Sequence, residues 1–253
     1  MIVDKNKVLQ FDKFLKVKDI YYLLYYVVNY DNNILYSDLD SYVIGKIKDD
    51  TSIWIWNDKI TDNLFTDLDN ILITGDNEIT CSLDLYDVIK DKYDTTNYLE
   101  INSMICDKCI KPKSIGTVVC ADINDRIELF NMFKNNSIES DKRVPTDEEL
   151  LNEINYFMRY NSLYVVKDNN KIISMCCFSK LDNMLKLTRV YTIPEYRNKG
   201  YCEWLIYNVT DRMINEGYLV LLYTLSNYIP SNRAYKRIGF IEKDKLVTFD
   251  INR

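Results

Sequence analysis

The sequence predicts an α/β protein of the α+β kind, built on a mixed, mostly antiparallel sheet flanked by helices. Segments rich in β-branched and aromatic residues recur along the chain between segments whose apolar residues have helical spacing. In the second half, three strand-like segments follow one another with only short turns between them, which is typical of an antiparallel meander. The first half alternates in a similar way, so we expect a second α/β domain there.

The composition excludes several kinds of active site. The 253 residues include no histidine, so neither a Ser-His-Asp triad nor a histidine-ligated zinc site can form. Any general base must be a carboxylate, a lysine, a tyrosine, a cysteine or a positioned water. The formal net charge of −6 argues mildly against a nucleic-acid partner. The longest apolar run, Ile20–Val28, is far shorter than the about 20 residues of a membrane span, so we expect no membrane partner.

Seven cysteines with irregular spacing, and no signal peptide, indicate reduced thiols in a cytoplasmic protein. Cys106 and Cys109 resemble half of a zinc knuckle or a redox pair. A full zinc site needs a second pair of ligands, and the redox motif needs a strand-to-helix context, so we set both interpretations aside and expect no metal. Cys176 and Cys177 have no activating neighbour in the sequence, and we interpret them as buried small side chains.

A domain boundary is predicted in the polar run Asp107–Ser114, where a proline lies among lysines. It separates an N-terminal α/β domain, residues 1–112, from a C-terminal domain, residues 113–253. In the first of these, apolar spacing predicts helices at Val17–Asn29, Leu35–Ile47 and Ser82–Tyr93. The run Ser52–Trp56 predicts a strand, and Ile71–Asp76 predicts a buried strand with its turn.

The C-terminal domain gives clearer signals. A strand is predicted at Thr117–Ala121 and a helix at Asp125–Phe133. Thr146 and Glu149 form a capping box that starts a second helix, continuing to Phe157. The meander, a further strand, a short helix and the last strands follow; their ranges are 163–166, 171–178 and 184–192 for the meander, 218–224 for the strand, 230–238 for the helix, and a final strand pair after residue 239.

The segment after the third meander strand carries the chemistry. It has a turn with Pro194, then an Arg-x-x-Gly-x-small loop, Arg197 to Cys202, that opens a long helix ending before Gly217. Such a loop directs free backbone N–H groups and the positive end of a helix dipole at one point, which suits a pyrophosphate. Gly200 lets an anion approach the backbone closely. By itself the pattern also fits an ordinary surface turn between a strand and an amphipathic helix.

This segment resembles the acetyl-CoA loop of the GNAT-superfamily N-acetyltransferases. The resemblance covers about residues 113–253. It implies that the preceding strand end contacts the pantetheine arm and that the loop contacts the phosphates. The implied pantetheine contacts are Val190, Tyr191 and Thr192, and the implied phosphate contacts are Arg197, Asn198, Lys199, Gly200, Tyr201 and Cys202. Cys202 departs from the family, which usually has Gly or Ala there.

A second block is similar to the same family: an asparagine, a short helix, and a tyrosine four residues before Gly239-Phe240. The resemblance implies that Tyr235 protonates the departing CoA thiolate. It also implies cofactor contacts from Asn227, Ser231 and Asn232. The insertion of Tyr228 and Ile229 departs from the commonest Asn-Pro spacing. Taken alone, Tyr235 is one of 21 tyrosines and would equally fit a half-buried packing role.

We therefore expect an N-acetyltransferase that moves an acetyl group directly from acetyl-CoA to a primary amine. The alternative is a protein that binds CoA or an acyl-CoA on the same fold, as a sensor or regulator without turnover. Glu195, Asp182 and Glu153 are candidate bases by rough location, and neither the acceptor amine nor the oligomeric state can be predicted. We expect the N-terminal domain to be a degenerate GNAT-like copy, in which Asp76–Glu78 replaces the basic phosphate loop.

Overall fold

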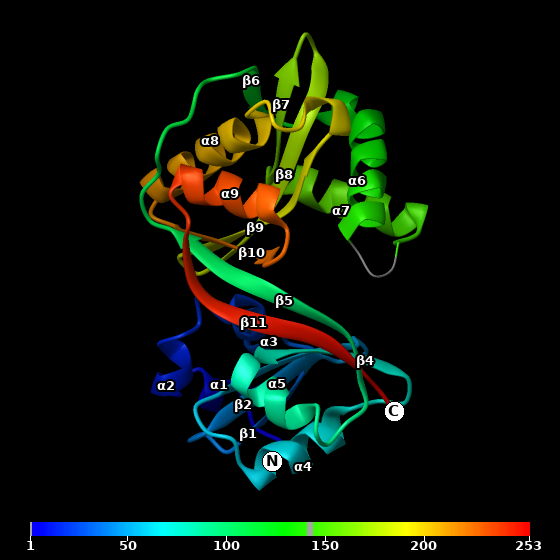
Figure 1. Cartoon of the computed structure of the whole chain (residues 1–253), viewed down its shortest axis with the longest axis vertical. Helices are drawn as coiled ribbons and strands as arrows, with labels where there is room; N and C mark the ends of the chain where they lie inside the picture. Colours follow the sequence, from blue (N-terminus) through cyan, green and yellow to red (C-terminus); the bar gives the residue numbers. More distant parts are fainter. Residues whose placement is uncertain (1, 141–143) are drawn as a thin grey trace. The chain divides into compact units, whose positions relative to one another are not determined.

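The computed structural model describes residues 2–140 and 144–253 and divides into two compact units. The first unit comprises Met1–Ser103, Thr224–Asn227 and Glu242–Arg253, and the second comprises Met104–Tyr223 and Tyr228–Ile241. The predicted domains were 1–112 and 113–253, so residues 104–112, 224–227 and 242–253 each fall in the other unit. Figure 1 labels the elements of both units. No helix in the described ranges is both long and apolar enough to cross a bilayer.

The first unit has five consecutive strands covered by helices. Its elements up to residue 106 are α1 (Lys5–Val8), α2 (Asp12–Leu15), α3 (Tyr22–Asn29), β1 (Asn33–Ser37), β2 (Tyr42–Ile47), β3 (Ser52–Asn57), α4 (Asp62–Ile71), β4 (Asp76–Ser82), α5 (Leu83–Ile89) and β5 (Thr95–Cys106). Strands β1, β2 and β3 are antiparallel, and β3 and β4 are parallel. The other edge of β4 pairs antiparallel with β11 (Ile241–Asn252). The predicted strand at Ser52–Trp56 and the helix after Ser82 are confirmed.

Two predictions for this unit are wrong. Residues 35–47 form the hairpin β1–β2 instead of a helix. The Asp38 carboxylate accepts hydrogen bonds from the amides of Asp40 and Ser41, at 3.0 and 2.7 Å, and this local cap competes with the helix. The segment predicted as a strand at residues 71–76 is the end of α4 and a turn. Gly75, with φ of 99°, closes that turn, and the strand begins only afterwards.

The second unit contains the predicted meander. Its elements are β6 (Thr117–Cys120), η1 (Ile123–Asp125), α6 (Arg126–Ser140), α7 (Asp147–Arg159), β7 (Leu163–Asp168), β8 (Lys171–Leu181), β9 (Met184–Thr192), η2 (Pro194–Tyr196), α8 (Tyr201–Asn215), β10 (Leu219–Leu225) and α9 (Ile229–Ile238). The strand order is β10-β9-β8-β7-β6, with only β9 and β10 parallel. The predicted mixed, mostly antiparallel sheet is confirmed.

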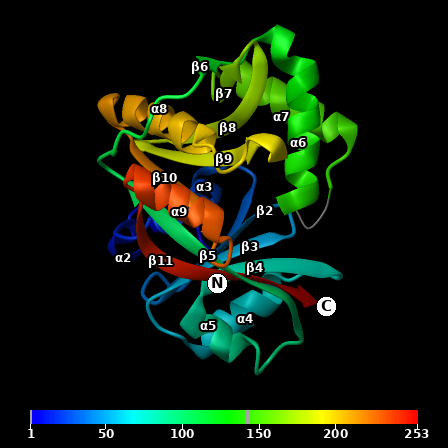
Figure 2. The same ribbon diagram turned by 45° about the horizontal axis from the view of Figure 1, so that its top comes forward.

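Helices cover both faces of the sheet in the second unit (Figure 2). On one face, α6 and α7 pack against β7, β8 and β9 through a core that contains Phe133 and Ile154. On the other face, α8 and α9 pack through a core that contains Leu205 and Tyr235. The capping box at Thr146 and Glu149 starts α7 as predicted: the Glu149 amide donates to the Thr146 hydroxyl at 3.2 Å, and the Thr146 amide donates to the Glu149 carboxylate at 2.7 Å.

The two units repeat one order of elements. In each, helices precede three antiparallel strands, then come a helix, a strand parallel to the third, another helix and a last strand. Each unit takes in part of the other's last strand. Val247, Phe249 and Ile251 of β11 lie in the core of the first unit, whereas Met104 and Cys106 at the end of β5 lie in the core of the second. The predicted pair of strands after Gly239 is wrong, because β11 is one continuous strand.

We predict that a fragment of residues 113–253 is less stable than a fragment of residues 104–253. Met104 and Cys106 are fully buried in the second unit, and the shorter fragment leaves their places empty. Loss of a buried methionine alone costs about 2–5 kcal/mol. Denaturant unfolding followed by circular dichroism should show a free energy of unfolding lower by at least about 2 kcal/mol for the shorter fragment. Equal stability of the two fragments would contradict the assignment of these residues.

Candidate functional site

Strand β9 loses one of its two neighbours part-way along its length. It pairs with β10 over Met184–Lys186, which face Leu219–Leu221, and within the described ranges that register ends there. On its other edge β9 stays paired with β8 as far as Thr192. The backbone groups of Leu187–Thr192 that face away from β8 are therefore not satisfied by the β9–β10 ladder. The predicted pantetheine contacts Val190, Tyr191 and Thr192 lie on this open edge.

A β-bulge interrupts β9 at the start of the open edge. Thr188 lies opposite Cys177 and Tyr191 lies opposite Met175, so two residues of β9 face one residue of β8. Arg189, in the bulge, has a left-handed φ of 51°. Its guanidinium makes a two-pronged ion pair with Glu153 of α7, with both N–O distances at 2.8 Å. Sequence reasoning missed this bulge, because no local signal marks it.

This ion pair occupies the Glu153 carboxylate, so Glu153 is not available as the general base. Arg189 also donates to the Ser137 hydroxyl of α6 at 3.0 Å, so the bulge is tied to both helices on this face.

Lys186 lies three residues before Arg189 in β9. Burial, followed by the nearby Arg189, lowers the pKa of its ammonium to about 8, while Glu153 opposes this shift. The pattern of the sequence gave no reason to single out Lys186.

The loop after β9 leaves the N-terminus of α8 open. Gly200 is the N-cap residue, with φ of 91°, and no side chain caps this helix end. The first intrahelical bond in this turn runs from the Trp204 amide to the Gly200 carbonyl at 2.9 Å. The amides of Tyr201, Cys202 and Glu203 therefore have no intrahelical acceptor. A Cβ built on Gly200 would meet no atom within 4 Å, so the space beside the Gly200 Cα is open at this helix end.

The Arg197 guanidinium is held by contacts within the protein rather than left free for a phosphate at the α8 N-terminus. Its Nε donates to the Thr192 carbonyl at 2.9 Å, and its Nη2 contacts both carboxylate oxygens of Glu139 at 2.8 and 2.7 Å. The guanidinium also lies 5.4 Å from the centre of the Tyr191 ring. Arg197 thus ties the loop to the end of β9 and to α6. Sequence reasoning missed its partner Glu139, which lies 58 residues away in the chain.

The other predicted loop residues divide into exposed and inward-facing ones. Asn198 and Lys199 are exposed, and the Lys199 ammonium lies 4.9 Å from the centre of the Tyr196 ring. The Tyr201 hydroxyl donates to the Asp168 carboxylate at 2.6 Å, so only its backbone can serve the helix terminus. The Cys202 side chain packs against the core between the sheet and α9, and burial raises the pKa of its thiol to about 12.

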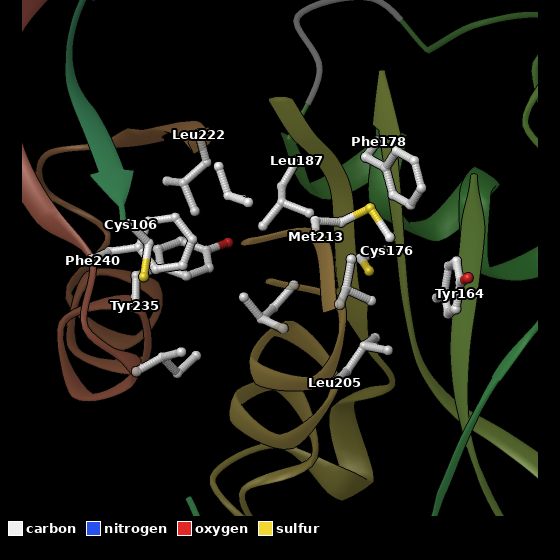
Figure 3. Packing of buried hydrophobic residues seen from close by; sticks show 14 of the residues in the cluster. Cys106, Tyr164, Cys176, Phe178, Leu187, Leu205, Met213, Leu222, Tyr235 and Phe240 are labelled. Carbon is white, nitrogen blue, oxygen red and sulfur yellow. The ribbon is translucent and has the colours of Figure 1, made fainter. Parts of the chain in front are cut away.

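Tyr235 is held inside the core on the α8–α9 face. It is 6% exposed, and its ring centre lies 5.8 Å from that of Phe240. In Figure 3 its hydroxyl points away from α9, toward the side of the cluster that carries Leu187 and Cys176. Burial raises the pKa of the Tyr235 phenol well above 10.0, the sulfur atoms of Cys202 and Cys176 raise it further, and a hydrogen bond with Ser231 opposes them. The phenol therefore stays protonated and can donate a proton.

The remaining residues of the second motif lie around α9. Ser231 is half-buried beside Tyr235. Asn232 is buried, and its side-chain amide donates to the Tyr228 carbonyl at 3.0 Å, which stabilises the first turn of α9. Gly239, with φ of 115°, ends the helix as predicted. Asn227 is exposed and is grouped with the first unit, so its implied contact with the cofactor stays a prediction.

The other two suggested bases, Asp182 and Glu195, are both exposed. Asp182 lies in the exposed turn between β8 and β9, at the opposite end of β9 from Thr192. Glu195 is exposed in η2, within the loop itself. Among residues 2–140 and 144–253, no group of three or more Cys, Asp or Glu side chains is arranged to hold a metal ion.

Comparison with known families identifies this arrangement. Residues 126–240 match the model of the Acetyltransferase (GNAT) family. The chain contains a GNAT acetyltransferase domain. The matched residues include the open end of β9, the loop to α8 and the helix that carries Tyr235. GNAT domains are acetyl-CoA-binding acyltransferase folds, so the predicted family resemblance is confirmed.

Solved structures extend the likeness to both units. An acetyltransferase of the GNAT family from Colwellia psychrerythraea is 10% identical, with a TM-score of 0.64, and the match covers 100% of this chain and 99% of that one. A Drosophila protein is 11% identical, with a TM-score of 0.70 and coverage of 99% and 97%. A GCN5-related N-acetyltransferase from Sphaerobacter thermophilus is 13% identical, with a TM-score of 0.59 and coverage of 85% and 81%. At these identities the likeness shows the fold. The comparison with curated proteins gave no match.

The first unit has a counterpart of the GNAT phosphate loop, but not where the sequence suggested. Asp76–Glu78 lies in β4 and pairs with β11, so that prediction is wrong. The segment between the third strand and the following helix is 58–61. There the amides of Asp58 and Lys59 donate to the Ser41 carbonyl at 2.7 and 3.3 Å, and the Thr61 hydroxyl caps α4. The helix end that is open in the GNAT domain is therefore closed here.

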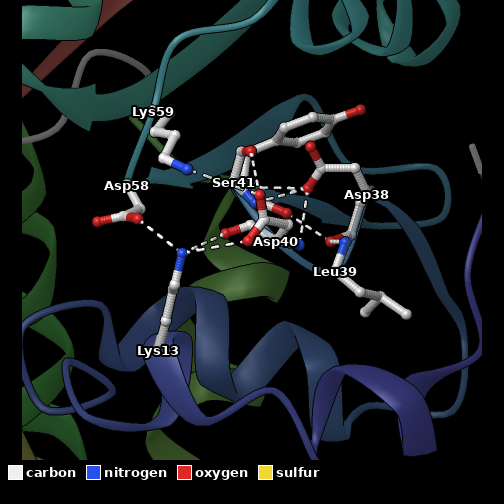
Figure 4. A network of polar contacts seen from close by, with 9 residues as sticks. Lys13, Asp38, Leu39, Asp40, Ser41, Asp58 and Lys59 are labelled. Atoms are coloured by element: carbon white, nitrogen blue, oxygen red, sulfur yellow. Dashed lines mark hydrogen bonds and ion pairs between the residues drawn. The ribbon is translucent and has the colours of Figure 1, made fainter.

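Charges complete this closure (Figure 4). The Lys13 ammonium contacts the Asp58 carboxylate at 2.9 Å and the Asp40 carboxylate at 3.2 Å. It also donates to the Asp40 carbonyl at 3.0 Å. Lys59 lies 3.7 Å from the second oxygen of Asp40. The cations are thus held by carboxylates, and an incoming phosphate would be repelled by Asp40 and Asp58.

We predict that Gly200→Glu weakens the binding of acetyl-CoA to the GNAT domain by at least about tenfold, which corresponds to about 1.4 kcal/mol. The new carboxylate would stand in front of the α8 amides, where it repels a phosphate and competes for the helix terminus. Isothermal titration calorimetry measures the change.

Gly217→Glu is the matched control for this variant. Gly217 follows the other end of α8, has φ of 92°, and has the same open space around a built Cβ. The control therefore introduces the same backbone strain and the same charge away from the α8 N-terminus. Equal losses of affinity in the two variants would contradict the site.

Proposed function

We propose that the chain is an N-acetyltransferase that transfers an acetyl group from acetyl-CoA directly to a primary amine. The observation that carries this proposal is the open edge of β9 at Val190–Thr192, joined by one short loop to the uncapped N-terminus of α8. An unpaired strand edge offers hydrogen bonds to an extended, amide-containing arm, and an uncapped helix terminus offers them to a pyrophosphate. CoA contains both groups.

The residues around these two features offer groups that suit each part of the cofactor. The amides of Tyr201 and Cys202 and the cradle at Gly200 would hold the pyrophosphate, with Lys199 and Asn198 at the exposed side of the loop. Val190–Thr192 would hold the pantetheine arm. Ser231 and Asn232 lie in α9, in the second motif, and would add further contacts to the cofactor. Arg197 would act by holding the loop against β9 through Thr192 and Glu139. When bound, acetyl-CoA supplies an acetyl thioester whose leaving group is a thiol.

Three tasks in the reaction fall to this chain. Backbone N–H groups at the open edge of β9 stabilise the negative charge that develops on the thioester oxygen. Tyr235, protonated because it is buried, donates a proton to the sulfur that leaves. The amine must lose its own proton, and in a protein without histidine a carboxylate or water accepts it. The acidic protein surface favours a cationic, amine-bearing acceptor.

All seven cysteines are free thiols, which supports a location in a reducing compartment such as the cytoplasm.

The first unit contributes no second cofactor site in this proposal, because its loop at residues 58–61 is closed by Ser41 and by two acids.

We predict that Tyr235→Phe lowers kcat by about 100-fold, near the lower end of what proton transfer contributes. The loss is at this end of the range because a thiolate is already a fair leaving group. The Kd for acetyl-CoA should stay the same, since phenylalanine keeps the ring packed against Phe240. The measurement follows acetylation of a panel of amines by mass shift, together with calorimetry of acetyl-CoA binding.

The pH profile adds a second readout for the same role. Because the pKa of Tyr235 is raised above 10.0, the phenol does not ionise as the pH rises to 10, and it should cause no fall in rate there. An unchanged kcat in Tyr235→Phe would contradict the assignment of the acid. Binding of acetyl-CoA with no turnover on any amine would favour the non-catalytic CoA-binding alternative.

A further inference from the structure

Two cysteines at the end of β5 lie within reach of each other. The sulfur atoms of Cys106 and Cys109 are 3.8 Å apart, and either thiol can donate to the other. The Cys106 thiol also donates to the Lys108 carbonyl at 3.5 Å, so the segment curls back on itself. Cys106 is fully buried and Cys109 is half-buried. The pair thus has one residue in the core and one at its partly exposed edge.

This segment lies directly against the end of the helix that carries Tyr235. The Ile110 amide donates to the Ile238 carbonyl, the last carbonyl of α9, at 2.6 Å. A Cβ built on Gly239 would lie 2.5 Å from the Lys108 carbonyl oxygen and 3.6 Å from the Cys109 Cα. The two segments are in direct backbone contact, so a shift of residues 107–109 is transmitted to the end of α9 through the Ile110–Ile238 hydrogen bond.

Cys106 belongs to the same buried cluster as Tyr235. Both contribute to the core between the sheet and α8 and α9, and Figure 3 shows Cys106 near Tyr235 and Phe240. A displacement of the Cys106 sulfur therefore reaches the proposed acid by two routes, through the packed core and through the end of α9. No other pair of cysteines among residues 2–140 and 144–253 is joined by a sulfur-to-sulfur hydrogen bond, and neighbouring Cys176 and Cys177 lie in cores on opposite faces of the sheet.

We propose that Cys106 and Cys109 are a covalent modification site, which forms a reversible disulfide by exchange with a low-molecular-weight disulfide and thereby slows acetyl transfer. The effect on transfer rests on the proposed function, whereas the disulfide itself does not. The sulfur atoms must approach from 3.8 Å to the about 2.05 Å of a disulfide, which pulls the segment between them. That movement is what displaces α9 and the Tyr235 hydroxyl.

The exchange is balanced in two steps. The Cys109 sulfur, after loss of its proton, attacks the small disulfide; a sulfur–sulfur bond to Cys109 forms and one small thiolate leaves and takes up a proton. The Cys106 sulfur, after loss of its own proton, then attacks Cys109 in this mixed disulfide. The second small thiol leaves, so two protein thiols are oxidised and one small disulfide is reduced to two thiols.

The hydrogen bond between the sulfur atoms divides the acidity of the pair unequally. It lowers the pKa of the Cys106 thiol, because the Cys109 S–H stabilises the Cys106 thiolate, while burial opposes this. The same hydrogen bond raises the pKa of the Cys109 thiol, and burial raises it further. The pair therefore loses its first proton at Cys106, and Cys109 becomes the attacking thiolate when its own proton moves along the contact to Cys106. Burial also raises the pKa of the Cys176 thiol and of the Cys202 thiol, the latter to about 12.

The test incubates the full chain with oxidised glutathione, blocks the remaining thiols by alkylation, and maps the cysteines by peptide mass spectrometry. We expect a peptide cross-linked through Cys106 and Cys109, formed in preference to adducts at the other cysteines. After desalting, the acetyl-transfer rate should have fallen about tenfold or more, since small misplacements of catalytic groups have effects of this size. Dithiothreitol should restore the rate.

Cys109→Ser and Cys120→Ser are the two matched variants, because both residues are half-buried cysteines outside the proposed catalytic machinery. Cys109→Ser should keep the rate of the reduced protein and lose the response to oxidised glutathione, whereas Cys120→Ser should keep both. Absence of the cross-link, or only a mixed disulfide at Cys109, would overturn the site. A cross-link that leaves the rate unchanged would overturn the effect on α9. If the reduced protein transfers no acetyl group at all, the proposed function fails, and the cross-link still decides the site.

Discussion

The site depends on one constraint: β9 keeps its pairing with β8 to its end but pairs with β10 over only three residues. A parallel strand that stayed in register would bury the backbone groups of Leu187–Thr192 in a ladder and leave nothing for a ligand. The separation leaves them outside that ladder, with the Thr192 carbonyl held by Arg197, on an inner strand whose other edge is fixed by β8. Rigid support on one edge and an open edge on the other are what a preorganised binding strand requires.

The bulge at Arg189 sets the geometry of that open edge. It adds one residue to β9, so that Val190 packs toward the α8–α9 core while Tyr191 lies in the core of the opposite face. The left-handed backbone of Arg189 carries strain that its surroundings must offset. The two-pronged contact with Glu153 and the bond to Ser137 hold it from α7 and α6. Arg197, held by Glu139, extends the same bracing to the loop.

Local signals in the sequence predicted much of this fold and part of the site. The capping box at Thr146, the left-handed end of α9 at Gly239 and the alternation in the meander are all encoded within a few residues, and each is present as predicted. Gly200 was recognisable for the same reason, since its role is its own backbone conformation. The hairpin at residues 35–47 was missed because the polar turn around Asp38 interrupts a run whose apolar spacing also fits a helix.

What the sequence could not predict is non-local. The ion pairs of Arg189 and Arg197 join residues 36 and 58 positions apart, and the bulge between Thr188 and Tyr191 is defined only by its partner strand. A contact of still longer range in the sequence is made by β11: this strand at the end of the chain pairs with β4 and completes the first unit. The contacts of residues 58–61 with Ser41 and Lys13 also join parts of the chain that are distant in sequence, so they could not be predicted. These contacts close the helix end in the first unit and distinguish the two repeats.

This difference between the two repeats, one open helix end and one closed, can be tested by measuring how many molecules of acetyl-CoA bind to each chain. Equilibrium dialysis of the full chain against acetyl-CoA counts the sites without reference to turnover or to the acceptor amine. The open helix terminus at Gly200 and the closed one at Thr61 together predict one molecule of acetyl-CoA bound per chain at saturation. Two molecules per chain, or none, would contradict the account.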